Sequence, residues 1–309
     1  LLSLADTLRF PVGYFGNDLA DSQPDTPAFF RSLRSTSVQD RKHARAYVEL
    51  VREFVLSLER EVELPPNSVP RYPFDPESRD LKMVDTIAAA TREEFGLDEY
   101  GPIPNVVASI ETRGVVVTRT HFDTEKVDAF SVAYEDRPVL VLCSDKNLFD
   151  RSRFDAAHEL GHLVMHFTGY PDIKEIEQQA HRFAASFLMP EQGIGEELPT
   201  RADWAQLVAL KRRWGVSIGA LLKRAETLNR MTPERYVQAL KTMSARGWRT
   251  HEPAPLGPPE SPRLLHEAIR ILEEDGFTIE DLADRASLPR EEVANIIQAT
   301  MPTRRRVTI

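Results

Sequence analysis

The segment His158-Glu159-Leu160-Gly161-His162 contains the residues of this chain best suited to chemistry. Two histidines four positions apart lie on one face of an α-helix, one turn from each other. Both imidazoles could therefore bind one tetrahedral metal ion, and Glu159, about 100° around the axis, would border that ion. A carboxylate in that place could take a proton from a water molecule that the metal activates. The alternative is a chance match on a surface helix whose histidines are solvated or packed.

A helix from Arg153 to Phe167 would carry this segment, because the stretch has no proline and has apolar residues along its length. Gly161 costs such a helix about 1 kcal/mol relative to alanine. We therefore expect another element to approach Gly161 closely, beside the metal.

A catalytic zinc site needs a third protein ligand and one open position. A helix expected over residues 173–190 has an apolar stripe and offers Glu175 and Glu177 as carboxylate candidates. His166 and His181 are the histidine alternatives. His166 continues the four-residue spacing, but a straight helix rises about 6 Å over four residues, too far for three tandem ligands.

Together these segments resemble the ImmA/IrrE family of zinc metallopeptidases. The resemblance rests on HELGH followed by Glu177-x-x-Ala180-x-x-Phe183-Ala184 and Phe187-Leu188-Met189-Pro190, and it covers roughly residues 80–190. It implies that His158, His162 and Glu177 bind Zn2+ and that Glu159 is the general base. A second donor to the oxyanion is not identified, and we leave His121, His166 and His181 out of the catalytic set.

The resemblance implies a zinc-dependent endopeptidase of a bacterial transcriptional-regulatory or stress-response system. Its protein substrate would be a repressor or a similar regulator. The alternative is a DNA-binding transcriptional regulator or sensor that keeps the metallopeptidase fold with little or no proteolysis. Glu159 favours the enzyme, because a sensor has no need of a general base.

Runs of β-forming residues at 105–110, 114–118, 128–134 and 138–143 precede the motif helix. They predict a small mixed or antiparallel sheet packed on that helix, flanked by N-terminal and C-terminal helical regions, so the expected fold class is α+β. The strand at 128–134 is the candidate for an edge that holds an extended peptide.

The 309 residues suggest more than one structural unit. We expect a remnant of an upstream helix-turn-helix domain (1–18), a helical connector with a proline-rich linker (19–76), a zinc metallopeptidase core (77–200), a basic helical subdomain (201–252), a linker (253–262) and a C-terminal helix-turn-helix-like module (263–309). The chain starts at Leu1 without methionine, which we read as a fragment of a longer protein. A missing N-terminal helix-turn-helix domain of the XRE type could bind DNA.

Charge is unevenly distributed along the chain. The net charge is −9, yet residues 201–249 contain eleven Lys or Arg and three Asp or Glu. A basic patch could meet DNA or an acidic partner, although charge runs are usually solvated helix faces. The candidate recognition helix of the C-terminal module opens with Arg290-Glu291-Glu292, which suits a packing or protein-contact role better than DNA binding. Only the tail Arg304-Arg305-Arg306 indicates otherwise.

Cys143 is the only cysteine, so an intrachain disulfide is excluded and a reducing cytoplasm fits. It ends an apolar run, as a buried strand cysteine would. No apolar run reaches the length of about 18 residues that a membrane-spanning helix needs. We therefore expect a cytoplasmic protein without a membrane partner, and the sequence leaves a homo-oligomer open.

Overall fold

The computed structural model describes residues 1–16, 37–122, 129–144, 148–167 and 174–301. At its centre lies a sheet of β1 (Val116–Thr120), β2 (Ala129–Val132) and β3 (Val139–Cys143), in the order β1-β3-β2. β1 runs parallel to β3, and β2 runs antiparallel to it. The predicted α+β fold with a small mixed sheet is confirmed.

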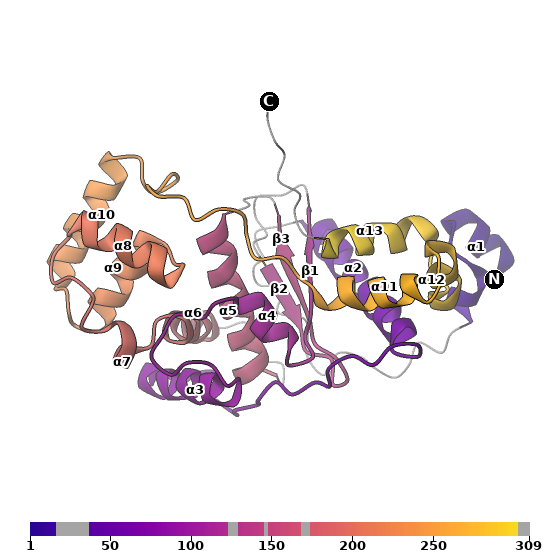
Figure 1. Cartoon of the computed structure of the whole chain (residues 1–309), viewed down its shortest axis with the longest axis horizontal. Helices are drawn as coiled ribbons and strands as arrows, with labels where there is room; N and C mark the ends of the chain where they lie inside the picture. Colours follow the sequence, from indigo (N-terminus) through magenta and orange to yellow (C-terminus); the bar gives the residue numbers. More distant parts are fainter. Residues whose placement is uncertain (17–36, 123–128, 145–147, 168–173, 302–309) are drawn as a thin grey trace.

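Both faces of this sheet are covered by helices (Figure 1). Side chains alternate along each strand, so that Leu140 and Leu142 join one hydrophobic core while Val139 and Val141 join the other. Burial on both faces explains why β3 reads as a continuous apolar run instead of an alternating one. In the described part of the chain, no helix is long and apolar enough to cross a membrane.

The first face of the sheet carries the helices around the HELGH segment. These are α3 (Leu81–Glu94), α4 (Val106–Glu111), α5 (Phe149–Met165) and α6 (Lys174–Leu188). The same core continues outward into α7 (Glu191–Ile194), α8 (Trp204–Trp214), α9 (Ile218–Thr227) and α10 (Pro233–Ala245) (Figure 1). α5 and α6 lie where helices were predicted at 153–167 and 173–190, although α5 begins four residues earlier, at Phe149, and each helix ends two residues earlier.

The second face of the sheet is covered by α2 (Val38–Leu58), α11 (Leu264–Glu274), α12 (Ile279–Ala286) and α13 (Arg290–Thr300). α1 (Leu2–Leu8) and the 3-10 helix η1 (Val12–Phe15) lie at the same end of the molecule (Figure 1). α12 and α13 form the expected helix pair, and the turn between them begins at Ser287 with a φ of 53°. Because α13 buries Val293, Ile296 and Ile297 in this core, the C-terminal helices act in packing, as their sequence indicated. The arginine tail at 304–306 lies outside the described residues.

One predicted element is wrong: the expected strand at 105–110 is the helix α4. In the expected helical connector, α2 ends at Leu58. α4 forms because its first N–H groups find acceptors: the Asn105 side chain accepts from Ala108 N at 2.9 Å. The Glu260 carboxylate, far away in sequence, accepts from Val106 N and Val107 N at 2.9 and 3.0 Å. These contacts override the β preference of a valine-rich stretch.

The proline-rich segment between α10 and α11 crosses the molecule as a strap (Figure 1). Carboxylates fasten it near both ends. Glu252 accepts from the N–H groups of Ile218 and Gly219, at 2.8 and 3.0 Å, at the start of α9. Glu260 binds the start of α4 in the same way, so the predicted linker at 253–262 is a docked segment.

Candidate metal centre

α5 and α6 pack closely where the HELGH segment faces the next helix. A Cβ added to Gly161 would lie 3.0–3.2 Å from the ring and Cβ of Phe183, so alanine would not fit without movement. The close approach that Gly161 led us to expect is therefore confirmed. It brings the first turns of α6, which carry Glu177, against the histidines of α5.

Three side chains converge at this contact. His158 Nε2 and His162 Nε2 lie 3.2 Å apart, and Glu177 places Oε2 3.4 Å from the former and Oε1 3.5 Å from the latter. Tetrahedral zinc with bonds of about 2.0–2.1 Å to nitrogen would separate neighbouring ligand atoms by roughly 3.3 Å. The separations between the two nitrogens, and between each nitrogen and its nearest Glu177 oxygen, therefore fit the ligands of one tetrahedral cation. Three protein ligands would leave a fourth position open.

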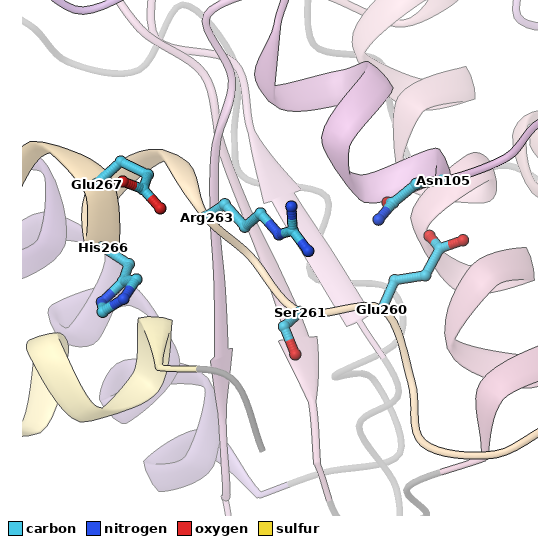
Figure 2. Close-up of a pocket in the computed structure, with 6 residues that line it drawn as sticks. All are labelled: Asn105, Glu260, Ser261, Arg263, His266 and Glu267. Atoms are coloured by element: carbon cyan, nitrogen blue, oxygen red, sulfur yellow. The ribbon is translucent and has the colours of Figure 1, made fainter. Parts of the chain in front are cut away.

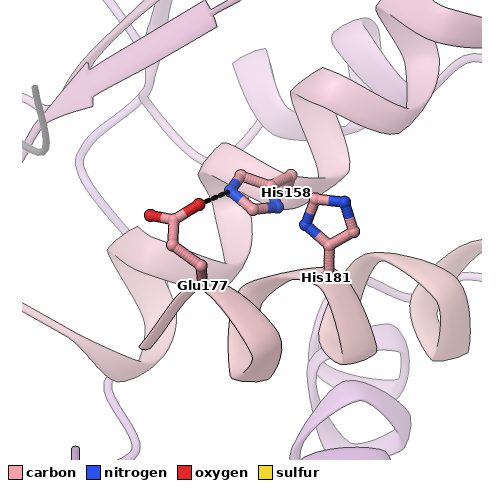
Figure 3. A group of neighbouring side chains, drawn as sticks. All are labelled: His158, Glu177 and His181. Atoms are coloured by element: carbon pink, nitrogen blue, oxygen red, sulfur yellow. Dashed lines mark ion pairs between the residues drawn. The ribbon is translucent and has the colours of Figure 1, made fainter. Parts of the chain in front are cut away.

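The other ligand candidates are less well placed. Glu175 turns to Arg79, with an Oε1–Nη2 distance of 3.5 Å. His181 comes from the same helix as Glu177 and faces His158, with ring centroids 4.8 Å apart (Figure 3). His158, Glu177 and His181 could also hold a metal, and so could His158, Glu159 and His162. In the first of these sets His181 is exposed, and in the second Glu159 accepts a hydrogen bond from Ser131. The short distances among His158, His162 and Glu177 favour the set of these three residues.

Glu159 is buried beside the cluster, with 4% of its surface exposed. Ser131, on β2, donates a hydrogen bond of 2.7 Å from its hydroxyl to Glu159 Oε2. This contact fixes the carboxylate next to the two histidines and ties it to the sheet. β2, the strand predicted to lie at an edge, is an edge of the described sheet and adjoins the cluster through Ser131. Its role in holding a peptide stays a prediction.

The two carboxyl groups of the site, Glu159 and Glu177, have pKa values shifted in opposite directions. Burial raises the pKa of Glu159 to about 7, although His158 and the Ser131 hydrogen bond pull it down. Burial also acts to raise the pKa of Glu177, but the neighbouring imidazoles of His158 and His162 outweigh burial and leave that pKa far below the usual value. Glu177 is thus held as an anion, as a metal ligand must be, while Glu159 is poised to exchange a proton near neutral pH.

Sequence reasoning did not anticipate the polar residues behind the cluster. His166 is fully buried, and its Nδ1 lies 3.0 Å from His162 Nδ1. Its Nε2 lies 2.7 Å from Gln179 Oε1. Burial, with His162 next to it, lowers the pKa of His166 to about 3, so this ring is neutral. The four-residue spacing of His166 from His162 excluded His166 as a third tandem ligand. The same spacing could have predicted that His166 contacts His162, which lies one helical turn earlier. Ser131, a hydroxyl inside an apolar strand, was a comparable signal.

Several charges of the basic 201–249 stretch are used inside the molecule. Lys211 is 3% exposed and pairs with Asp150 and Glu252 at 2.6 and 2.8 Å. Arg224 is also buried and donates to the carbonyl of Met189 at 2.9 Å. These acceptors lie outside residues 201–249. The excess of Lys and Arg counted in this stretch is therefore larger than the positive charge that the stretch exposes at the surface.

A pocket of about 410 Å3 lies away from the metal cluster, between the strap and α11 (Figure 2). Asn105, Glu260, Ser261, Arg263, His266 and Glu267 line it. Its most buried carboxylate, Glu260, already binds the start of α4 and Arg153, so we assign this pocket no chemistry.

Comparison with known families identifies the part of the chain that contains this site. A search of curated proteins found no match. Residues 110–226 match the family model Peptidase_M78, described as the IrrE N-terminal-like domain. The matched region begins inside the expected core, contains the sheet, α5 and α6, and crosses the domain boundary predicted at residue 200. The segment that carries the His/Glu cluster is therefore similar to the IrrE N-terminal-like domain of a metallopeptidase family.

Proposed function

We propose that this protein is a zinc-dependent endopeptidase in which His158, His162 and Glu177 hold the metal and Glu159 is the general base. The observation that carries the proposal is that His158 Nε2 and His162 Nε2 lie 3.2 Å apart and each lies 3.4–3.5 Å from an oxygen of Glu177, with the buried carboxylate of Glu159 beside them. Two nitrogens and one carboxylate oxygen suit zinc, and the three-ligand set is that of a catalytic site. The similarity of residues 110–226 to a metallopeptidase family supports the same reading.

A bound zinc ion would supply Lewis-acid chemistry, acidifying water and polarising a carbonyl oxygen. The residues of the chain would move the proton. Ser131 occupies Oε2 of Glu159, which leaves Oε1 to accept the proton of the attacking water. The same carboxyl group would then deliver that proton to the leaving amine. A pKa near 7 lets Glu159 act as base and acid in turn.

We propose a transcriptional regulator inside the cell as the substrate class, on the strength of the family similarity. The test uses purified protein, its metal content by mass spectrometry, and a co-encoded regulator as the cleavage probe. Glu159→Gln is expected to keep one zinc per chain while cleavage falls by about 10²–10⁴. Glu177→Gln is expected to weaken zinc binding, whereas the matched change Glu175→Gln on the same helix leaves it unaltered.

Two results would refute the proposal. A wild-type chain that takes up no divalent metal would remove the site. Zinc bound in full, with no cleavage that depends on Glu159, would favour the alternative of a sensor that retains the fold.

A further inference from the structure

Behind the metal cluster, a chain of hydrogen bonds runs from a loop through two buried side chains to one of the histidines. Gln179, on α6, is fully buried. Its side-chain nitrogen lies 3.2, 3.0 and 2.9 Å from the carbonyl oxygens of Asp75, Pro76 and Ser78. Carbonyl oxygens only accept hydrogen bonds, so the nitrogen of the amide must face them. The amide oxygen therefore faces His166.

The orientation of that amide determines which nitrogen of His166 carries hydrogen. Gln179 Oε1 can only accept, so His166 Nε2, at 2.7 Å, must donate to it. A neutral imidazole has one N–H, which leaves a lone pair on His166 Nδ1. That lone pair lies 3.0 Å from His162 Nδ1, which must then be the protonated nitrogen of its own ring. The remaining nitrogen, His162 Nε2, is left with its lone pair among the donor atoms of the metal cluster.

We infer that His166 and Gln179 are positioning residues that fix the tautomer and ring orientation of His162, so that its Nε2 lone pair always points at the metal site. This inference rests on the proposed metal centre. The opposite tautomer of His162 would place a hydrogen at the ligand position and would have to rearrange before binding metal. We call the hydrogen-bonded series from the loop at 75–78 through Gln179 and His166 to His162 the relay. The loop, in the proline-rich part of the chain, anchors the relay through its backbone carbonyls.

The cost of breaking such a relay can be measured as metal affinity. Partners that orient a histidine ligand typically contribute about 10–100-fold to metal affinity. His166→Leu removes the acceptor for His162 Nδ1 and is expected to weaken zinc binding by that factor. In His166→Asn the side-chain oxygen takes the place of Nδ1, so zinc affinity is expected to stay within a few-fold of wild type. Comparing the two variants separates the effect of losing the hydrogen bond to His162 from the effect of losing the imidazole ring of His166.

The experiment combines two readouts. Zinc affinity is measured by competition with a chromophoric chelator, with Thr91→Val as the control. That change also removes a buried hydrogen bond, from Thr91 Oγ1 to Ile87 O at 2.8 Å, but on α3 and away from the relay, so zinc affinity should not change. The imidazole nitrogens of metal-free protein labelled with 15N-histidine are followed by NMR. We expect hydrogen on Nδ1 of His162 and on Nε2 of His166, and a mixture of tautomers in Gln179→Met.

Hydrogen on Nε2 of His162 in the metal-free wild type would overturn the inference. So would folded His166→Leu that binds zinc as tightly as wild type. If the leucine variant does not fold, the tautomers of wild type and His166→Asn still decide. Because the NMR readout needs neither metal nor substrate, it also separates failure of the relay from failure of the proposed peptidase activity.

Discussion

The strap that joins the two sides of the molecule should depend on one buried ion pair. Glu260 and Arg153 pair at 2.8 Å, and their side chains are 6% and 4% exposed. Burial disfavours the charge on each: it raises the pKa of Glu260 and lowers the pKa of Arg153, while the partner opposes the shift in both cases. Removing one member of a buried pair leaves the other uncompensated, at a cost of about 3–5 kcal/mol. We expect Glu260→Ala to lower the free energy of unfolding by that amount, and α4 also loses the acceptor for its first N–H groups.

Urea unfolding followed by far-UV circular dichroism measures this loss. In the double variant Arg153→Met/Glu260→Leu both charges disappear, so the loss should be smaller than in Glu260→Ala alone. As the control, Glu267→Gln breaks the exposed pair of Glu267 with Arg270, and the unfolding midpoint should not move. The reasoning is refuted if Glu260→Ala costs less than about 1 kcal/mol, which is the value of an exposed pair. It is also refuted if the double variant is less stable than the single one.

Three further predictions concern buried contacts. Gly161→Ala gains about 1 kcal/mol of helix propensity, but crowding against Phe183 should outweigh it and displace α6; zinc competition should show weaker binding, and unchanged affinity would contradict the packing argument. Burial raises the pKa of Glu111 to about 7 against backbone N–H groups and Arg263 that lower it. A carboxyl group whose pKa is raised by folding stabilises the folded state at pH values below its pKa in the unfolded chain, about 4.5. This contribution is lost as the pH rises through the folded-state pKa of about 7. Melting temperatures should therefore fall from pH 5 to pH 8 more in wild type than in Glu111→Gln, and parallel profiles would disprove the linkage. Lys211→Met should lower the free energy of unfolding in urea by about 3 kcal/mol, because two partly buried carboxylates lose their partner; an unaltered midpoint would contradict the role of this lysine as a buried ion-pair partner.

The local part of the site could be predicted from the sequence. Four-residue spacing puts His158 and His162 on one face of α5, and the apolar stripe of the next helix predicts α6. Gly161, inside the motif, correctly predicted a close neighbour. Glycine is unfavourable within a helix, so it is best explained there by a neighbour that leaves no room for a larger side chain. The helix pair of the C-terminal module was also predicted, and α12 and α13 confirm it.

Contacts between distant segments decided what the sequence left open. The choice between Glu175 and Glu177 depends on how α6 lies against α5, which fixes the carboxylate that meets both imidazoles. The strand predicted at 105–110 became α4 because Glu260, more than 150 residues away, accepts its first N–H groups.

The sequence by itself determined the chemical types at the site and the helices that carry them, since one-turn spacing is a local property of the chain. Only the tertiary structure decided which carboxylate completes the donor set, which hydroxyl holds Glu159, and how the loop at 75–78 reaches His162 through Gln179 and His166. The physical reason is that hydrogen bonds and ion pairs require distances of a few ångströms, and for segments far apart in the chain only packing sets those distances.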